Sequence, residues 1–274
     1  MKNFIAVLVL YNIDLSKSET FMSLNDAMQH VDGTLDLVIY DNSPVSIEPD
    51  PLTSERFNIT YIHDPANPGV STAYNVAAEI GRKLGKEWLI LFDQDTTFPD
   101  DILKTYVNTI SIHPGEKLFA PLMITGDNKA VSPCRFSINK GFSTTNFSTG
   151  KRSLDGHSLI NCGLCIKLEA FYKINGYDPE FKLDYSDHDF VSRYKKNINS
   201  EVVVLNTRVK HMLSAKQLNS LESDQSRFIY FRDALRRYSM IHGGRLYSNF
   251  NILLRGLKLS MMHRTANFLK LTFS

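Results

Sequence analysis

The first 120 residues alternate between short apolar runs and segments in which apolar residues recur at helical spacing. The short runs are rich in β-branched and aliphatic residues, which favours strands. Strands that alternate with helices form βαβ units, so the pattern predicts a mostly parallel sheet with helices on both faces. The four expected strands are FIAVLVL (4–10), LDLVIYD (35–41), NITYIHD (58–64) and EWLILFD (87–93).

The clearest predicted helix follows the segment NPGVSTAYN, and Gly85 supplies its end. A second helix is expected to begin at Pro99, with Asp100 and Asp101 in its first turn, where acids complement the helix dipole. A third is expected near Ser186. The apolar positions of the first helix, three or four residues apart, are Val70, Ala73, Tyr74, Ala77, Ile80 and Leu84.

Polar side chains stand where each expected strand ends. In an open parallel sheet, ligands bind outside the carboxyl ends of the strands. We therefore expect one rim of the sheet to gather these side chains. They are Asn12, Asp41, Asp64, and the pair Asp93 and Asp95.

The pattern loosens between residues 122 and 160 into irregular strands and loops, and a further strand, VVVLN, is expected at 202–206. Neither an internal repeat nor a low-complexity linker is present. We expect one domain over 1–215, with a first half of about 1–120 and a second half of about 121–215. Residues 216–274 are expected to form a helical extension.

Composition narrows the class of protein. A chain of 274 residues with 43% hydrophobic and 22% charged content is typical of a globular protein. The net charge of +2 gives no general argument for nucleic acid, so no nucleic-acid partner is expected. The apolar run at the amino terminus is too short to span a bilayer. Three cysteines in so long a chain indicate a reducing compartment, and the cytoplasm is the expected location.

The element Asp93-Gln94-Asp95 fits two chemistries. Its carboxylates can hold a hard divalent cation such as Mg²⁺ or Mn²⁺ that also binds phosphate oxygens. The string DQDTT also fits the nucleophile loop of haloacid-dehalogenase-like phosphatases, in which Asp93 would take a phosphoryl group. That alternative needs the motif after the first strand of its domain, whereas about ninety residues of βαβ pattern precede it here.

A set of motifs in order extends this picture across the chain. The chain resembles the family-2 glycosyltransferases, inverting enzymes of the Rossmann-like GT-A fold, and among them the bacterial rhamnosyltransferase-like group. The motifs, spread over about residues 4–235, are VLVLYN, VIYDNSP, NPGVSTAYNVA, FDQDTTFP, NCGLCIKLEAFYKINGYDPEF, DYSDHDFVSR, His211 and FIYFRDALRRY.

The resemblance implies roles for individual residues. Asp187 would be the general base, Asp95 would bind the metal that bridges the diphosphate, and His211 would be a second metal ligand. Asp41 would contact the nucleobase, and His211 with Arg232 would hold the departing diphosphate. The Gly that often follows such a His in the family is absent after His211. The implied nucleotide-sugar-binding set is Asn12, Asp41, Asn67, Gly69, Asn75, Asp93, Gln94, Asp95 and Arg232.

The implied reaction transfers a sugar, with inversion and with Mg²⁺ or Mn²⁺, to a hydroxyl of a polysaccharide or lipid-linked glycan of the cell envelope. The resemblance favours dTDP-rhamnose as donor. A UDP-hexose or galactofuranose donor is the alternative within the same class. The alternatives outside it are the phosphatase and a glycan-binding module without catalysis.

Two further features have a structural and a functional interpretation each. Cys162-Gly-Leu-Cys165 is interpreted as buried packing, because a zinc site needs a second ligand pair that Cys134 alone does not supply. The last helical segment mixes apolar and basic residues. It fits a helix at the inner face of the cell membrane, or one that packs on its own domain or in a homodimer.

Overall fold

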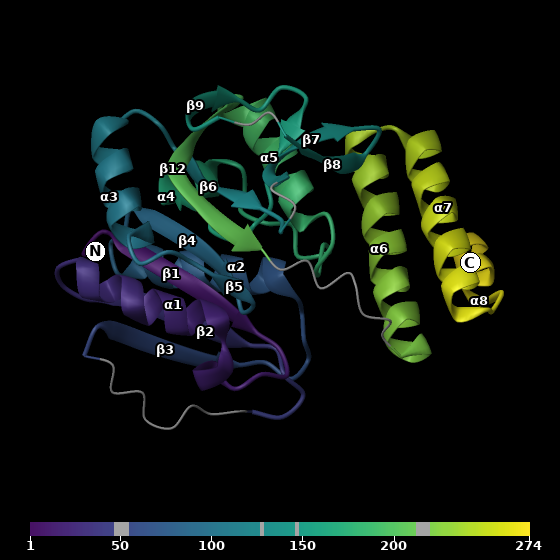
Figure 1. Cartoon of the computed structure of the whole chain (residues 1–274), viewed down its shortest axis with the longest axis horizontal. Coiled ribbons are helices and arrows are strands. Elements are labelled where there is room, and N and C mark those ends of the chain that lie inside the picture. Colours follow the sequence, from purple (N-terminus) through teal and green to yellow (C-terminus); the bar gives the residue numbers. More distant parts are fainter. Residues whose placement is uncertain (47–54, 127–128, 146–147, 212–219) are drawn as a thin grey trace.

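The computed structural model describes residues 1–46, 55–126, 129–145, 148–211 and 220–274, with only the backbone described at His211. Its first half alternates strands and helices as the sequence predicts (Figure 1). The elements are β1 (Phe4–Leu10), the 3-10 turn Leu15–Lys17, α1 (Glu19–Ala27), the 3-10 turn Met28–His30, β2 (Leu35–Asp41), β3 (Phe57–His63), α2 (Val70–Lys83), β4 (Trp88–Asp93), β5 (Thr96–Thr97) and α3 (Ile102–Ile112).

The second half adds shorter strands and then helices. Its elements are β6 (Leu118–Ile124), β7 (Ala130–Ser137), β8 (Lys140–Thr144), β9 (Gly150–Ser153), β10 (His157–Ser158), β11 (Cys165–Lys167), α4 (Leu168–Lys173), α5 (Ser186–Asn197), β12 (Glu201–His211), α6 (Leu221–His242), α7 (Arg245–His263) and α8 (Asn267–Phe273).

The strands form one mixed sheet with the order β10-β7-β6-β11-β4-β1-β2-β3, and β12 pairs with β5, β6 and β9. Strands β3, β2, β1 and β4 are mutually parallel, as the βαβ pattern predicts. Strand β11 then runs antiparallel between β4 and β6. The central strand β1 is buried along its whole length, which explains its continuous apolar run.

Helices cover both faces of the sheet, which confirms the expected α/β class. Alternate residues of β1 point to opposite faces. Ile5 and Val7 pack with buried side chains of α2, α4 and α5. Ala6 and Leu8 pack on the other face with α1 and α3. Each side of β1 therefore has its own core.

One element differs from the sequence prediction, and the strand β6 is one that the prediction did not include. Helix α3 begins at Ile102, three residues after Pro99, with Asp101 as its N-cap. Strand β6 lies in a stretch that contains Pro121, a residue that argues against a strand because it cannot donate a ladder hydrogen bond. The ladder with β12 shifts register there, from Val204 opposite Ala120 to Arg208 opposite Leu122. This bulge accommodates the proline.

The helices α6, α7 and α8 stand beside the sheet domain (Figure 1). They share a third buried cluster, in which Phe228, Leu235 and Phe268 pack with Phe181 and Tyr185 from the segment before α5. The expected boundary at residue 215 lies outside the described residues. Within the described residues, no helix has the length and hydropathy needed to cross a membrane.

Candidate active site

The parallel strands end level with one another, so the predicted rim exists. Leu10 of β1 pairs with Asp41 of β2, and Val9 pairs with Asp93 of β4. Asp41 in turn pairs with His63, the residue before Asp64. Polar residues from Asn12 to Asp95, separated by as many as 83 positions in sequence, therefore lie along one edge of the sheet.

The turn that carries Asp93, Gln94 and Asp95 is closed by residues from the start of the chain. The Thr20 hydroxyl donates to the carbonyl oxygen of Thr96 (2.9 Å) and accepts from its amide (3.0 Å). The Gln94 side chain accepts a hydrogen bond from the amide of Tyr11 (2.7 Å). Gln94 is thus bound to backbone, and the two carboxylates on either side of it remain available for other contacts.

Asp93 is the partly buried member of the pair. Its carboxylate accepts a hydrogen bond from the Tyr74 hydroxyl of α2 at 3.2 Å. Burial raises the pKa of Asp93 to about 7, and the charges of Asp95 and Asp187 act in the same direction, against the Tyr74 hydrogen bond. Burial therefore disfavours the ionised form of this carboxyl group.

Asp95 is exposed, and no hydrogen bond or ion pair reaches its carboxylate from the described part of the chain. Backbone pairing places His211, the last residue of β12, opposite Thr96. The predicted role of the His211 side chain lies outside the described residues. Among the side chains that are described, no group of three or more His, Cys, Asp or Glu forms a metal site.

Asp187 lies in the first turn of α5, where the helix dipole favours a negative charge. Its carboxylate accepts a hydrogen bond from the amide of His188 (2.7 Å) and remains 19% exposed. Burial raises the pKa of Asp187, although the nearby His188 opposes the shift. The His188 ring is itself held by the Ser158 hydroxyl (2.8 Å) and packs on Phe136.

Side chains that the sequence analysis did not single out connect the two acidic elements. The rings of Tyr74 and Tyr177 pack edge to face, 5.0 Å apart. The Tyr177 hydroxyl donates to Asn161 (2.8 Å), and Asn161 donates to Ser186 (2.9 Å), the neighbour of Asp187. Burial, with the charges of Asp187 and Asp93, holds the pKa of Tyr177 well above its ordinary value. Tyr177 therefore lies within the electrostatic reach of both carboxylates.

Two residues of the predicted nucleotide set instead join α2 to the segment before α5. The amide of Val70, next to Gly69, donates to the carbonyl of Lys182 (2.8 Å). A Cβ on Gly69 would come within 2.2 Å of that oxygen, and its φ of +95° favours glycine. Asn75 exchanges two hydrogen bonds with the backbone of Tyr177, at 2.8 and 2.9 Å.

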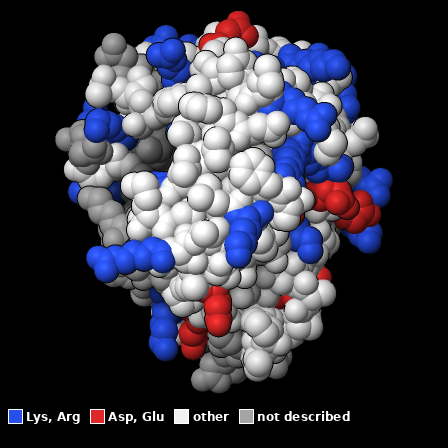
Figure 2. Space-filling view, turned by 90° about the vertical axis from the view of Figure 1, so that its right-hand side faces the viewer, with Lys and Arg blue, Asp and Glu red and all other residues white. Residues whose placement is uncertain are grey.

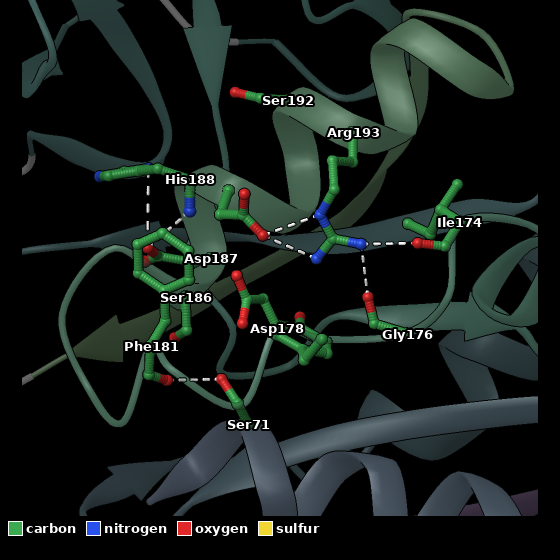
Figure 3. Close-up of polar contacts among 12 residues, drawn as sticks. Ser71, Ile174, Gly176, Asp178, Phe181, Ser186, Asp187, His188, Ser192 and Arg193 are labelled. Atoms are coloured by element: carbon green, nitrogen blue, oxygen red, sulfur yellow. Dashed lines mark hydrogen bonds and ion pairs between the residues drawn. The ribbon is translucent and has the colours of Figure 1, made fainter. Parts of the chain in front are cut away.

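The same junction is visible around Arg193 and Ser71 (Figure 3). Arg193 donates to the carbonyl oxygens of Ile174 and Gly176, both at 2.6 Å, and to the buried Asp189. Ser71 of α2 donates to the carbonyl of Phe181 (2.6 Å). These bonds fix α5, and therefore Asp187, against the amino-terminal half of the chain.

The remaining nucleotide-set residues lie along the rim with different surroundings. Asp41 is fully buried and accepts from the Tyr61 hydroxyl (2.7 Å) and the Ser43 amide (2.9 Å). Asn12 is exposed, and Asn67 is half-buried in a turn after Asp64. Both asparagines have positive φ, a conformation that asparagine tolerates better than most residues.

Arg232, which the resemblance assigns to the diphosphate, binds the end of the chain in this structure. Its guanidinium donates to the carbonyl of Leu271 (2.7 Å) and the hydroxyl of Ser274, both at the end of the chain, and pairs with Asp233. No contact in the described residues connects Arg232 with Asp93, Asp95 or Asp187. Its geometry fits the packing of α8 on α6.

The three cysteines are free and buried, as the packing interpretation predicts. Burial raises the pKa of each thiol, which disfavours the reactive thiolate. Separately, a cavity of about 450 Å³ opens beside β7 and β8. It contains none of the predicted site residues and is lined by Lys129, Arg135, Ser137, Ile138, Phe142, Ser143, Thr144 and Thr145.

Comparison with known proteins adds independent evidence on the fold. No protein-family model matches the chain. The dTDP-rhamnosyl transferase RfbF of Shigella flexneri is 23% identical over 194 residues, which cover 70% of this chain and 62% of that protein. The chain thus spans less than two thirds of the length of this relative.

Solved structures match over more of the chain. S. aureus TarS 1-349 in complex with UDP-GlcNAc is 14% identical, with a TM-score of 0.57, and the match covers 90% of this chain and 69% of that one. GalNAc-T7 with UDP, GalNAc and Mn2+ is 13% identical, with a TM-score of 0.58, over 86% and 47% of the two chains. Sheet order, helix placement and these likenesses agree that the chain has a GT-A fold like that of family-2 glycosyltransferases.

Proposed function

We propose that the chain is a glycosyltransferase that moves a sugar from a nucleotide-sugar donor to a hydroxyl of a glycan acceptor. One observation carries the proposal: a continuous set of contacts connects Asp93 at the end of β4 with the start of α5. Tyr74 donates to Asp93 and packs on Tyr177, and Tyr177 is linked through Asn161 to Ser186, the neighbour of Asp187. Acids from two distant parts of the chain therefore share one site. RfbF and the nucleotide-bound neighbours support the class of donor.

Asp187 is the proposed general base. A base must be ionised to accept a proton, and it works best when its pKa lies near the working pH. The raised pKa of Asp187 moves it in that direction. As the acceptor oxygen bonds to the anomeric carbon, the bond from that carbon to the diphosphate oxygen breaks and the hydroxyl proton passes to Asp187. Attack from the face opposite the diphosphate inverts the anomeric centre.

Asp95 is the proposed metal ligand. Mg²⁺ in such sites is held by one or two carboxylates together with substrate phosphates, and Asp95 is an exposed carboxylate without a described partner. A bound Mg²⁺ or Mn²⁺ would stabilise the negative charge on the departing diphosphate. The GalNAc-T7 neighbour was solved with Mn2+. Asp93, held by Tyr74, would shape the donor pocket next to this position.

The proposed donor is dTDP-rhamnose, which the likeness to RfbF supports, and a UDP-hexose is the second candidate because TarS is solved with UDP-GlcNAc. The phosphatase alternative finds less support. Asp93 ends β4, and the strands β1, β2 and β3 precede it, whereas the phosphatase needs this motif after the first strand of its domain.

The test begins with a thermal-shift screen of nucleotide sugars with and without Mn²⁺, since a ligand that binds the folded state raises its melting temperature. Once the donor is identified, Asp187→Asn should lower the transfer rate by at least about 10³-fold and leave donor binding unchanged. Asp95→Ala should remove the metal-dependent part of donor binding. Asp100→Asn, an exposed acid nearby, is the control and should change neither. Transfer that survives Asp187→Asn would overturn the proposal.

A further inference from the structure

Helix α7 has its apolar side facing outward. A helix at the surface of a globular protein normally buries its apolar stripe. The buried positions of α7 are instead mostly small or polar: Ser248, Asn251, Ile252, Gly256 and Ser260. Its exposed large apolar side chains are Leu246 (84% exposed), Tyr247 (53%), Phe250 (55%), Leu254 (43%), Leu257 (39%) and Met261 (75%), with Met262 (43%) beside them.

The first six of these residues form a continuous stripe, because steps of three or four residues return to the same side of a helix. We call Leu246, Tyr247, Phe250, Leu254, Leu257 and Met261 the α7 stripe. It runs from the first to the last turn of the helix, a length of about 22 Å at 1.5 Å per residue. A stripe so exposed and so long marks an interaction surface.

The inner side of α7 is already satisfied by the rest of the chain, so the helix cannot simply turn over. The side-chain amide of Asn251 donates to the carbonyl of Ile138 (2.9 Å). Asn139 donates to the hydroxyl of Ser248 (3.0 Å). Gly256 lies so close to α8 that a Cβ would come within 2.4 Å of the Thr272 hydroxyl. The orientation of the stripe is therefore built into the fold.

The charge of the surrounding segment indicates what the stripe meets. Residues 234–274 contain seven Lys and Arg and no Asp or Glu, whereas residues 1–233 contain 24 Lys and Arg and 29 Asp and Glu. Four of the seven, Arg245, Lys258, Arg264 and Lys270, are exposed. Lys258 is one helical turn from Leu254 and Met261. Figure 2 looks onto this side and shows a broad uncharged area with Lys and Arg around it.

We propose that the α7 stripe and its basic neighbours dock on the surface of a bilayer that contains anionic phospholipids, with α7 lying parallel to that surface. Apolar side chains of such a helix enter the boundary between headgroups and acyl chains, while Lys and Arg meet the anionic headgroups. A second copy of the chain fits less well. Pairing two stripes would bring together two segments that each carry only positive charge, which is unfavourable.

The test is co-sedimentation of the full chain with vesicles of neutral phosphatidylcholine and with vesicles that also contain phosphatidylglycerol. We expect binding to the anionic vesicles, weakened by high salt because salt screens charge. The variant L246Q/F250Q/M261Q, and separately K258E/R264E/K270E, should each lower the partition coefficient by at least about tenfold. No nucleotide sugar is present, so this result is independent of the proposed function.

A matched control is available on α3, on the opposite side of the molecule (Figure 1). The variant K104E/I112Q changes an exposed lysine and a 72% exposed isoleucine and should bind vesicles as the unchanged chain does. Equal binding to neutral and anionic vesicles would overturn the proposal, as would no binding to either. A concentration-dependent dimer that L246Q/F250Q/M261Q dissociates, without vesicle binding, would assign the stripe to a second copy instead.

Discussion

The two ends of this molecule place their charges in opposite ways. At the carboxyl edge of the sheet, the acids Asp93 and Asp187 are largely withdrawn from water, and their pKa values are raised. In the C-terminal helices, basic residues stand outside, around the α7 stripe, with no acid among the last 41 residues. Removing a charged group from water costs free energy, which neighbouring groups must offset by staying in fixed positions. Exposed charge needs no such groups, so substitutions in the two regions should have different consequences.

The junction between α2 and the segment before α5 should be the most sensitive part of the acidic region. Gly69→Ala would place a Cβ 2.2 Å from the carbonyl oxygen of Lys182, so we expect the free energy of unfolding to fall by at least about 3 kcal/mol. Gly33→Ala is the matched control. It also has positive φ, at +82°, but nothing lies within 4 Å, and it should cost about 1 kcal/mol. Denaturant unfolding measures the free energy of unfolding of both variants. Similar losses would contradict the close approach of Gly69 to the Lys182 carbonyl.

Asp189 should come next. Its carboxylate is buried between Arg193 (2.7 Å) and His242 (2.8 Å). Burial opposes ionisation, but these two partners outweigh it and lower the pKa of Asp189. Asp189→Asn should cost about 2–4 kcal/mol at pH 7, because it leaves a buried guanidinium without its counter-charge.

The pH dependence of that loss follows from the lowered pKa. The stability that ionised Asp189 contributes is present above the ordinary carboxyl pKa of about 3.9 and is lost as the pH falls through the lower, folded-state value. The difference between Asp189→Asn and the unchanged chain should therefore shrink as the pH falls below about 3.9. Asp233→Asn, which changes a side chain that is 56% exposed, should cost less than about 0.5 kcal/mol at every pH.

A smaller effect is expected at Tyr74, on catalysis rather than on folding. Tyr74→Phe keeps the ring that packs on Tyr177 and removes the hydroxyl that donates to Asp93. The loss of one hydrogen bond of about 1 kcal/mol should slow transfer about fivefold. Tyr172→Phe, whose hydroxyl lies 3.5 Å from the exposed Glu79, is the control. An unchanged transfer rate in Tyr74→Phe would show that the hydrogen bond to Asp93 does not contribute to the reaction.

The smallest effect on folding should come from the basic region. The variant L246Q/F250Q/M261Q changes three exposed residues, so the free energy of unfolding should change by less than about 0.5 kcal/mol in the absence of lipid. Thermal and denaturant unfolding measure this. A loss above about 2 kcal/mol would show that the α7 stripe is packed against the chain, and the contrast between the two regions would fail.

The sequence predicts the acidic region well where periodicity decides the structure. The four parallel strands and the helix after Gly69 follow from apolar spacing, and the rim of polar residues follows from strand direction. Residue roles are harder to predict. Asn75 and Gln94 bind backbone, and the helix pattern assigns Tyr74 only to the core. Contacts between residues about 100 positions apart leave no local signal in the sequence.

The basic region shows the same limit from another side. Apolar and basic residues mixed along 250–270 predict an amphipathic helix without saying which side faces the core. The answer depends on Ser248, Asn251 and Gly256, whose partners lie on β7–β8 and α8. Arg232 belongs to a motif of the site by resemblance, yet its guanidinium holds the end of the chain.

Asn139 gives this arrangement a mechanical consequence. Its side chain donates to the carbonyls of Gly243 (2.9 Å) and Gly244 (3.3 Å), at the corner between α6 and α7. Gly141 lies two residues further along the same hairpin. A Cβ added there would be 3.6 Å from the ring of His188, the neighbour of Asp187. The β7–β8 hairpin thus contacts both the outermost helix and the residues beside Asp187. Any tilting of α7 would therefore be passed to the hairpin that packs beside His188, the neighbour of the proposed general base.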